Sequence, residues 1–280
     1  MISCPVCDGS HCPPAFRVNE HDLFRCGNCG TVFVHPPPTS AQLTELYGRE
    51  DYYDGARRQE ARLRTEALDR ARRLKHSGAR SVLDVGCAAG YFLDAGRELG
   101  LEMSGVEPGP AANDAVGRGH TVHRKWLGEL DLGDVRFDAV TLWEVVEHVV
   151  DPIQLLRAAV SLVRPGGILA LSTPSMSGLP ARLLGARFPM VTPPEHLTLL
   201  TRESAELLLR KCELEPIRIT SFSNLGPEQL RAGFNRFIPE QFRALRSAAR
   251  LASGHLVAAT ALMDRLGLGS ELEIFARRAR

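Results

Sequence analysis

The sequence predicts an α/β protein with a doubly wound parallel sheet, preceded by a small module stapled by cysteines. From Arg80 onward, short apolar runs of strand length alternate with segments of helical periodicity, which is typical of helices covering both faces of a parallel sheet. Five of the seven cysteines fall in the first 29 residues. The 280 residues suffice for one large core and one small extra module.

The composition excludes several classes of function. The net charge is +1 and charged residues make up 24%, so the chain has no overall attraction to nucleic acid or anionic membranes. We find neither a signal peptide pattern nor an apolar stretch of about 18 residues. We therefore expect a cytoplasmic protein without a membrane span, whose cysteines are metal ligands, catalytic groups or core residues rather than disulfides.

The N-terminal cysteines form two C-x2-C pairs, Cys4-Pro-Val-Cys7 and Cys26-Gly-Asn-Cys29, separated by 18 residues. Each pair can place two thiolates on one turn, and two such turns make a tetrahedral zinc site. We predict a zinc ribbon at residues 1–35 with a structural zinc ion, because protein fills all four positions. The alternative is a redox-active pair. No basic and aromatic stripe accompanies the ribbon, so we do not expect it to bind nucleic acid.

Residues 36–77 are predicted to form a linker and N-terminal helices. Three prolines follow His35 and favour an extended connector. Thr39 or Ser40 can cap a helix over 41–47, and an apolar stripe predicts a second helix over 57–75. This second helix either only packs on the core, or the region also covers a cofactor site. In the second case a carboxylate would be bound by Tyr52, Tyr53, Arg58 or Arg62.

A glycine turn opens the predicted sheet. Val82, Leu83 and Val85 belong to a buried strand, and Gly86 and Gly90 bracket the turn that leads into a helix from Tyr91. Such a turn exposes backbone N–H groups to a ligand. Further strands are predicted at 102–107, 121–123, 137–142, 167–173, 217–222 and 271–277.

Two later segments point to the same edge of the sheet. Glu107 ends the second strand twenty-one residues after Gly86, where a carboxylate can accept two hydrogen bonds from a ribose diol. The segment 137–152 is predicted to be a buried strand that runs directly into a helix. Ligands of doubly wound sheets bind at the carboxyl ends of the strands, so we expect the site there.

Together these motifs resemble the class I S-adenosylmethionine-dependent methyltransferases. The segment 84–90 resembles their first motif, Glu107 their ribose-binding acid, and 164–167 the turn before their fifth strand. The resemblance implies a seven-stranded Rossmann-like sheet that binds S-adenosyl-L-methionine. It assigns the cofactor to Asp84, Gly86, Cys87, Ala88, Gly90, Tyr91, Glu107, Pro108, Leu142, Trp143 and Glu144. A nicotinamide enzyme would require G-x-G-x-x-G, but Ala88 and Tyr91 occupy two of those positions.

The chain departs from the family at Ala88, where a glycine is common. Alanine tolerates this position when φ is negative, so we expect a loop without a left-handed residue there.

A narrower resemblance concerns the ribbon, the segment 144–148 and the segment 194–204. These are similar to a subgroup of polysaccharide and secondary-metabolite biosynthesis, whose core is similar to ubiquinone-pathway O-methyltransferases. The resemblance implies that Glu144, Glu147 and His148 could hold a second divalent cation, since positions i, i+3 and i+4 share one helix face. Alternatively, Glu147 and His148 cap and pack the helix.

Transfer of the methyl group to a hydroxyl requires a base, and histidine suits neutral pH. His196 and His148 are the candidates, with Glu147 as a third catalytic residue. His196 follows a proline- and glycine-containing loop over 174–195 that suits a shaped lid. It either acts as the base or only holds the lid in place.

We therefore predict a methyltransferase core at 78–225, a helical insertion at 226–268 and the last strand of the core at 269–280. The insertion covers the acceptor, makes a dimer contact or fills out the core. The predicted function is O-methylation of a small molecule such as a sugar, polysaccharide precursor, quinol or secondary metabolite, by a monomer or homodimer. The alternatives are an RNA methyltransferase that uses the ribbon for binding, a sugar C-methyltransferase, and a non-enzymatic zinc adaptor.

Overall fold

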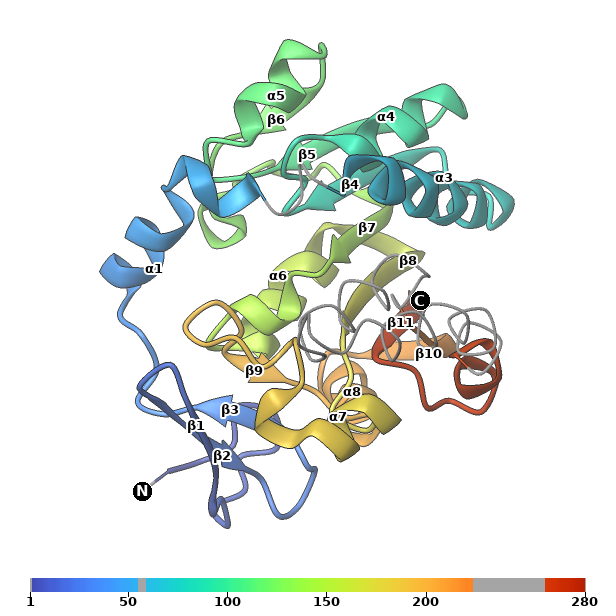
Figure 1. Cartoon of the computed structure of the whole chain (residues 1–280). Helices are drawn as coiled ribbons and strands as arrows, with labels where there is room; N and C mark the ends of the chain where they lie inside the picture. Colours follow the sequence, from blue (N-terminus) through green and yellow to red (C-terminus); the bar gives the residue numbers. More distant parts are fainter. Residues whose placement is uncertain (1, 55–58, 224–259, 280) are drawn as a thin grey trace, which may run out of the picture.

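The computed structural model describes residues 2–54, 59–223 and 260–279, and its centre is a seven-stranded sheet (Figure 1). The strand order is β6-β5-β4-β7-β8-β11-β10. Five strands run parallel: β4 (Ser81–Val85), β5 (Glu102–Val106), β6 (Thr121–His123), β7 (Phe137–Trp143) and β8 (Val163–Pro174). At one edge, β11 (Glu271–Arg278) pairs antiparallel with β8, and β10 (Leu214–Phe222) pairs antiparallel with β11. The predicted α/β fold is confirmed.

Helices cover both faces of this sheet. On one face, α3 (Glu60–His76) and α4 (Tyr91–Glu98) pack apolar side chains against alternate residues of β4, β7 and β8. On the other face, α6 (Pro152–Leu162) and α8 (Arg202–Lys211) pack on the remaining residues of the same strands. A short helix, α5 (Ala112–Gly117), lies beside β6. Burial of both faces explains why the strands read as continuous apolar runs.

The N-terminal module forms a second, smaller sheet. It comprises β1 (Pro14–Val18), β2 (His21–Arg25) and β3 (Val32–Val34), all antiparallel. Its fourth strand, β9 (Thr198–Leu199), comes from the segment that follows the predicted lid. The ribbon therefore shares one sheet with a segment from the second half of the chain, as Figure 1 shows at the lower left. The domain boundaries given above stay a prediction.

Two N-terminal helices connect the ribbon with the core. α1 (Ser40–Tyr47) begins after Thr39, whose hydroxyl accepts from the backbone N–H of Gln42 in a capping box. A single 3₁₀ turn, η1 (Glu50–Tyr53), follows it. The predicted helix over 57–75 is present as α3, although residues 57 and 58 lie outside the described residues.

The predicted lid over 174–195 contains regular structure. α7 (Leu179–Leu184) and the 3₁₀ turn η4 (Gly185–Arg187) occupy its middle. Met176, Phe188 and Val191 are buried against ribbon residues such as Leu23 and Val34. The predicted insertion at 226–268 lies largely outside the described residues, but residues 260–265 are helical.

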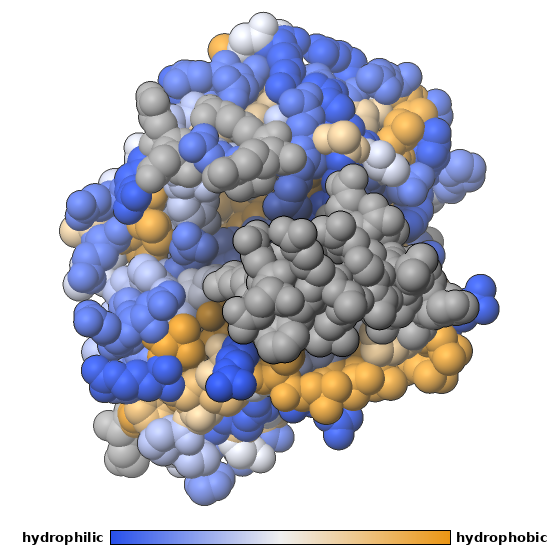
Figure 2. Space-filling view, viewed as in Figure 1, coloured by the Kyte–Doolittle hydropathy of each residue, from blue (hydrophilic) through white to orange (hydrophobic). Residues whose placement is uncertain are grey.

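The visible face is mostly hydrophilic, with an apolar band along its lower part (Figure 2). Among described residues, the most exposed large apolar side chains include Leu183, Leu262 and Leu266. None of the helices in the described ranges combines the length and apolar character needed to cross a bilayer.

Leu200 offers a test of how firmly the ribbon is packed on the core. It is fully buried in the cluster that joins Cys4 and Val6 of the ribbon with Leu156 and Leu208. We expect Leu200→Ala to lower the free energy of unfolding by about 2–5 kcal/mol, because it leaves a cavity. Urea denaturation followed by circular dichroism measures this.

The matched control is Leu183→Ala, since that side chain is 75% exposed. Its effect should stay within about 0.5 kcal/mol. Equal effects of the two substitutions would contradict the packing described here.

Candidate active site

A cavity of about 560 Å³ lies at the carboxyl ends of the parallel strands. Its walls come from the turn after β4, from Glu107 after β5, from the segment after β7 and from α3. β4 pairs with β5 on one side and with β7 on the other, so the order in which strands are added to the sheet reverses at β4. Ligands of such sheets bind at this switch point, and the volume suits a small molecule.

The glycine turn after β4 takes the shape that its residues allow. Gly86 has φ +74°, and a side chain there would meet Val145 at 2.7 Å. Gly90 has φ +84° and is the N-cap of α4, where a side chain would meet Ala115 at 2.8 Å. Both positions require glycine because of backbone conformation and close approach.

The expectation for Ala88 is wrong. Its φ is +43°, in the left-handed region that costs a residue with a Cβ roughly 1–2 kcal/mol. In this conformation its backbone N–H donates to Oε2 of Glu107 at 3.0 Å. A hydrogen bond to a buried carboxylate offsets the strain.

Glu107 is 4% exposed and accepts two further hydrogen bonds. The backbone N–H of Gly109 donates to Oε1 at 2.7 Å, and the hydroxyl of Tyr53 donates to the same atom at 3.0 Å. The carboxylate is therefore held at the cavity wall in one orientation. A fixed carboxylate at this position can accept hydrogen bonds from a diol.

Five of the other predicted cofactor residues line the same cavity, and five do not. Asp84 is buried and accepts from the hydroxyl of Thr141 at 2.6 Å, while burial raises its pKa to about 7. The ring of Tyr91 lies between the guanidinium groups of Arg64 and Arg118, at 4.9 and 4.8 Å. Those that line the cavity are Gly86, Ala88, Pro108, Trp143 and Glu144, and those that do not are Asp84, Cys87, Gly90, Tyr91 and Leu142.

The predicted passage from β7 directly into a helix is wrong. Glu144 has φ +54°, so the chain turns sharply at the strand end. A single 3₁₀ turn, η3 (Val146–His148), follows, and α6 starts only after Asp151 has capped it. Glu144 therefore does not share a helix face with Glu147 and His148. The Asp151-Pro152 pair supplies the cap and first helical residue and sets this later start.

The turn brings Glu147 and His148 to His196 instead. One possible ligand atom from each of these three residues lies within 4.8 Å of the other two. The imidazole rings of His148 and His196 are 4.7 Å apart and nearly perpendicular. We call these three residues the acceptor-side cluster. They are the three candidate catalytic residues, and all line the cavity.

Backbone carbonyls orient both histidines. Nδ1 of His148 lies 2.9 Å from the carbonyl of Glu195, and Nδ1 of His196 lies 2.7 Å from that of Met190. A carbonyl only accepts, so each Nδ1 carries the proton and each Nε2 keeps its lone pair. Burial lowers the pKa of both side chains, and the neighbouring His196 lowers that of His148 further, to about 3.

Glu147 completes the cluster with a buried carboxyl group. It is fully buried, and Oε2 accepts from the hydroxyl of Thr173 at 3.0 Å. Burial and then the charge of Glu144 raise the pKa of Glu147 well above its ordinary value. Oε1 has no hydrogen-bond partner and lies 3.9 Å from Nε2 of His148.

An aromatic wall faces this cluster. Tyr47 and Tyr52 pack edge to face, Trp126 packs on Tyr47, and the hydroxyl of Tyr52 lies 3.5 Å from Nδ1 of His148. The sequence predicts Tyr52 and Tyr53 as a cover of the site, whereas Tyr47 and Trp126 belong to the same wall without having been predicted. The position of Trp126 shortly after β6 was the available signal, since this too is a strand end.

The basic residues near the cavity are partly engaged in structure. Arg62 pairs with Glu66 on α3 at 3.1 Å. Arg70 pairs with Glu273 of β11 and lies 4.4 Å above the Trp143 ring. Arg58, the remaining candidate for a carboxylate, lies outside the described residues.

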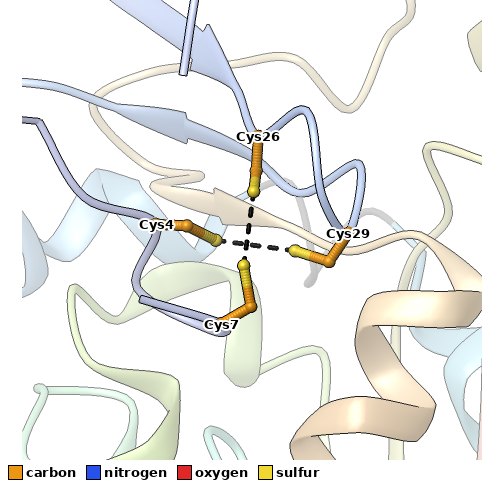
Figure 3. Close-up of side chains that lie close together, drawn as sticks. All are labelled: Cys4, Cys7, Cys26 and Cys29. Atoms are coloured by element: carbon orange, nitrogen blue, oxygen red, sulfur yellow. Dashed lines mark hydrogen bonds between the residues drawn. The ribbon is translucent and has the colours of Figure 1, made fainter. Parts of the chain in front are cut away.

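The four paired cysteines converge at the ribbon (Figure 3). The Sγ atoms of Cys4 and Cys29 are 3.6 Å apart, and those of Cys7 and Cys26 are 3.3 Å apart. A tetrahedral zinc site with Zn–S bonds of about 2.3 Å has edges of about 3.8 Å, close to these separations. The four thiols could thus hold one ion without a rearrangement of the chain.

Comparison with known proteins assigns the chain to a family. Residues 53–219 match the family described as a methyltransferase domain. The chain belongs to this methyltransferase domain family. The prediction of a class I S-adenosylmethionine-dependent methyltransferase is thus confirmed at the level of family and fold.

The curated relatives include a ubiquinone biosynthesis O-methyltransferase of Xanthomonas campestris, 38% identical over 112 residues. The match covers 37% of this chain and 46% of that protein, so the chain spans about half the length of the curated relatives it matches.

Solved structures show the same fold at low identity. A methyltransferase of Thermotoga maritima, described as a possible histamine N-methyltransferase, is 19% identical with a TM-score of 0.58, over 84% of this chain and 99% of that one. A 1,6-didemethyltoxoflavin N1-methyltransferase of Burkholderia thailandensis, solved with S-adenosylhomocysteine, is 17% identical with a TM-score of 0.54, over 95% and 99%.

The lowered pKa of His148 leads to a pH prediction. The unfolded chain takes up a proton on His148 near pH 6.5, whereas the folded protein does so only near pH 3. The stability that depends on neutral His148 is therefore complete above pH 6.5 and is lost as the pH falls toward 3. In NMR spectra we expect the His148 ring signals to stay constant from pH 8 to 5.

The same signals should titrate near pH 6.5 in protein unfolded by urea. A titration of His148 near pH 6.5 in the folded protein would show that this ring is solvated.

Proposed function

We propose that this protein transfers the methyl group of S-adenosylmethionine to an oxygen atom of a small molecule, with a histidine as base. The observation that carries the proposal is that one cavity contains both Glu107 and the acceptor-side cluster. A nucleotide-binding edge and a proton acceptor are thus available to two molecules bound side by side.

Glu107 would bind the ribose diol, and the backbone of the turn from Gly86 to Ala88 would face the rest of the cofactor. When bound, the cofactor supplies an activated methyl group. The chain has to hold the acceptor in line with that group and exclude water. This alignment lowers the activation barrier by several kcal/mol. The aromatic wall of Tyr47, Tyr52 and Trp126 provides a surface for this.

His196 is the proposed base, with His148 as the alternative. Its Nε2 is the atom able to accept a proton, because Nδ1 is committed to Met190. Glu147 would remain protonated and neutral, which avoids a buried negative charge beside the acceptor.

The cavity favours a neutral, hydroxylated acceptor over nucleic acid. Its walls carry only three basic residues, Arg62, Arg70 and Lys125, and two of these form ion pairs with Glu66 and Glu273. So few cations available to phosphates do not favour a nucleic-acid backbone. A sugar, polysaccharide precursor, quinol or secondary metabolite is therefore the proposed acceptor. A sugar C-methyltransferase and an RNA methyltransferase are the alternatives.

Two metal ions enter the proposal in different ways. The ribbon would hold a structural zinc ion through Cys4, Cys7, Cys26 and Cys29, since all four ligand positions come from the chain. The second divalent cation that the family resemblance implies would use Glu147, His148 and His196, whereas Glu144 would not belong to the ligand set. Two histidines that donate their other nitrogen to carbonyls are suitable ligands.

Replacement of Glu107 tests the cofactor site. We expect Glu107→Gln to weaken binding of S-adenosylhomocysteine at least about tenfold, because an amide cannot accept from both the Ala88 and Gly109 amides and the ribose. Isothermal titration calorimetry measures the affinity. Glu98→Gln, an exposed position on α4, should bind like the wild type. Equal affinities of all three proteins would refute the cofactor site.

Replacement of His196 tests the base, once labelled cofactor has identified an acceptor among sugars, nucleotide sugars, quinols and phenols. We expect His196→Gln to reduce kcat about 100-fold or more, with little change in affinity for S-adenosylhomocysteine. His76→Gln, at an exposed position, is the control. Wild-type turnover of His196→Gln would reject this base.

The cation alternative gives a different result in the same assay. If a divalent ion acts at the cluster, dialysis against a chelator abolishes turnover of the wild type and added Mg²⁺ or Mn²⁺ restores it. If a base acts alone, added Mg²⁺ or Mn²⁺ leaves turnover unchanged, and any loss on dialysis is reversed by Zn²⁺ at the ribbon instead.

A further inference from the structure

Besides the pairing of β3 with β9, three hydrogen bonds connect the ribbon with the segment that carries His196. The side-chain amide of Asn19 donates to the carbonyl of Pro193 at 3.0 Å, three residues before His196. The backbone N–H of Val34 donates to the carbonyl of Leu197 at 2.9 Å. The hydroxyl of Thr201 donates to the carbonyl of Cys29 at 2.8 Å. These contacts bracket His196 on both sides.

Leu197 connects the ribbon directly with the acceptor-side cluster. Its carbonyl accepts from β3, and its own N–H donates to the carbonyl of Glu147 at 2.7 Å. One residue further, the hydroxyl of Thr198 donates to the carbonyl of Val149 at 3.0 Å. The backbone on both sides of His148 is thus fastened to a strand whose other edge belongs to the ribbon.

The strand β9 depends on this pairing. It contains only two residues, which face Val32 and Phe33 of β3. So short a strand is not stable without a partner. The position of His196 therefore follows the position of β3.

The turn that carries Cys29 holds the carbonyl to which the Thr201 hydroxyl donates. Cys29 belongs to the four-cysteine site, and its turn is closed by backbone hydrogen bonds from Cys26 to Thr31 and from Gly30 to Cys26. Gly30 has φ +75°, and a side chain there would meet Thr201 at 2.9 Å. A ribbon this small needs its metal to keep such a turn folded.

We propose that the ribbon is a positioning module for methyl transfer, in which the metal-loaded cysteine turn holds Thr201 and β9, and thereby His196, in place against His148 and Glu147. Thr201 is the positioning residue. The proposal uses the metal site proposed above, but does not depend on the identity of the acceptor.

Thr201→Val tests this contact in the full-length protein loaded with zinc. The variant keeps the shape of the side chain but removes the hydrogen bond to Cys29. We expect exchange of the Leu197 amide to accelerate at least about fivefold, and the NMR ring signals of His148 and His196 to shift because their mutual orientation changes. Affinity for S-adenosylhomocysteine should change less than about twofold.

Two control variants separate positioning from helix capping. Thr201 is also the N-cap of α8, in a reciprocal capping box with Ser204. Ser204→Ala weakens this box but keeps the bond to Cys29, so its histidine signals should match the wild type. Thr201→Ser keeps both functions of the hydroxyl and should restore the wild-type signals and the Leu197 exchange rate.

Removal of zinc is the second test of the positioning proposal. Protein stripped by a chelator should show the changes of Thr201→Val, and added Zn²⁺ should reverse them. The proposal is overturned if Leu197 exchange and the histidine signals stay unchanged in both Thr201→Val and stripped protein. It is also overturned if cofactor affinity falls in parallel with the histidine changes, because the ribbon would then stabilise the whole fold.

A result on Glu107 does not affect this outcome. If cofactor binding fails in the calorimetric experiment, the histidine signals and the exchange rate still report the positioning.

Discussion

The parallel pairing of β4 with β5 on one side and β7 on the other is the constraint on which the rest of the structure depends. It brings three chain segments that are far apart in sequence to one edge of the sheet. Because parallel strands present their carboxyl ends together, Gly86, Glu107 and Glu144 meet at one cavity. The helices on both faces bury the strands and keep this edge open.

Buried polar groups then determine what the cavity can do. Glu107 accepts hydrogen bonds from backbone amides at the cavity wall, whereas Glu147 is buried with one unpartnered oxygen and a raised pKa. The two histidines are neutral because burial disfavours their charged forms. In the proposed function, Glu107 faces the cofactor and the neutral histidines face the hydroxyl of the acceptor.

The ribbon adds a second constraint from outside the sheet. A three-stranded module of this size gains stability by packing Val6 and Phe33 into the main core and by pairing β3 with β9. In return, the segment around His196 obtains a rigid neighbour. The loop that carries His196, the proposed base, is thus supported on both sides, whereas a surface loop of similar length lacks such support.

The sequence by itself determined the fold class and the strands of the seven-stranded sheet, and it predicted the cysteine site and the role of Glu107, since these depend on local periodicity, glycine spacing and ligand spacing. Tertiary structure decided the rest. The left-handed backbone of Ala88 and Glu144 is stabilised or imposed by distant partners, so local propensity misjudged both. The association of His196 with Glu147 and His148 depends on strand β9 pairing with the ribbon, a contact between residues more than 160 positions apart that no local pattern encodes.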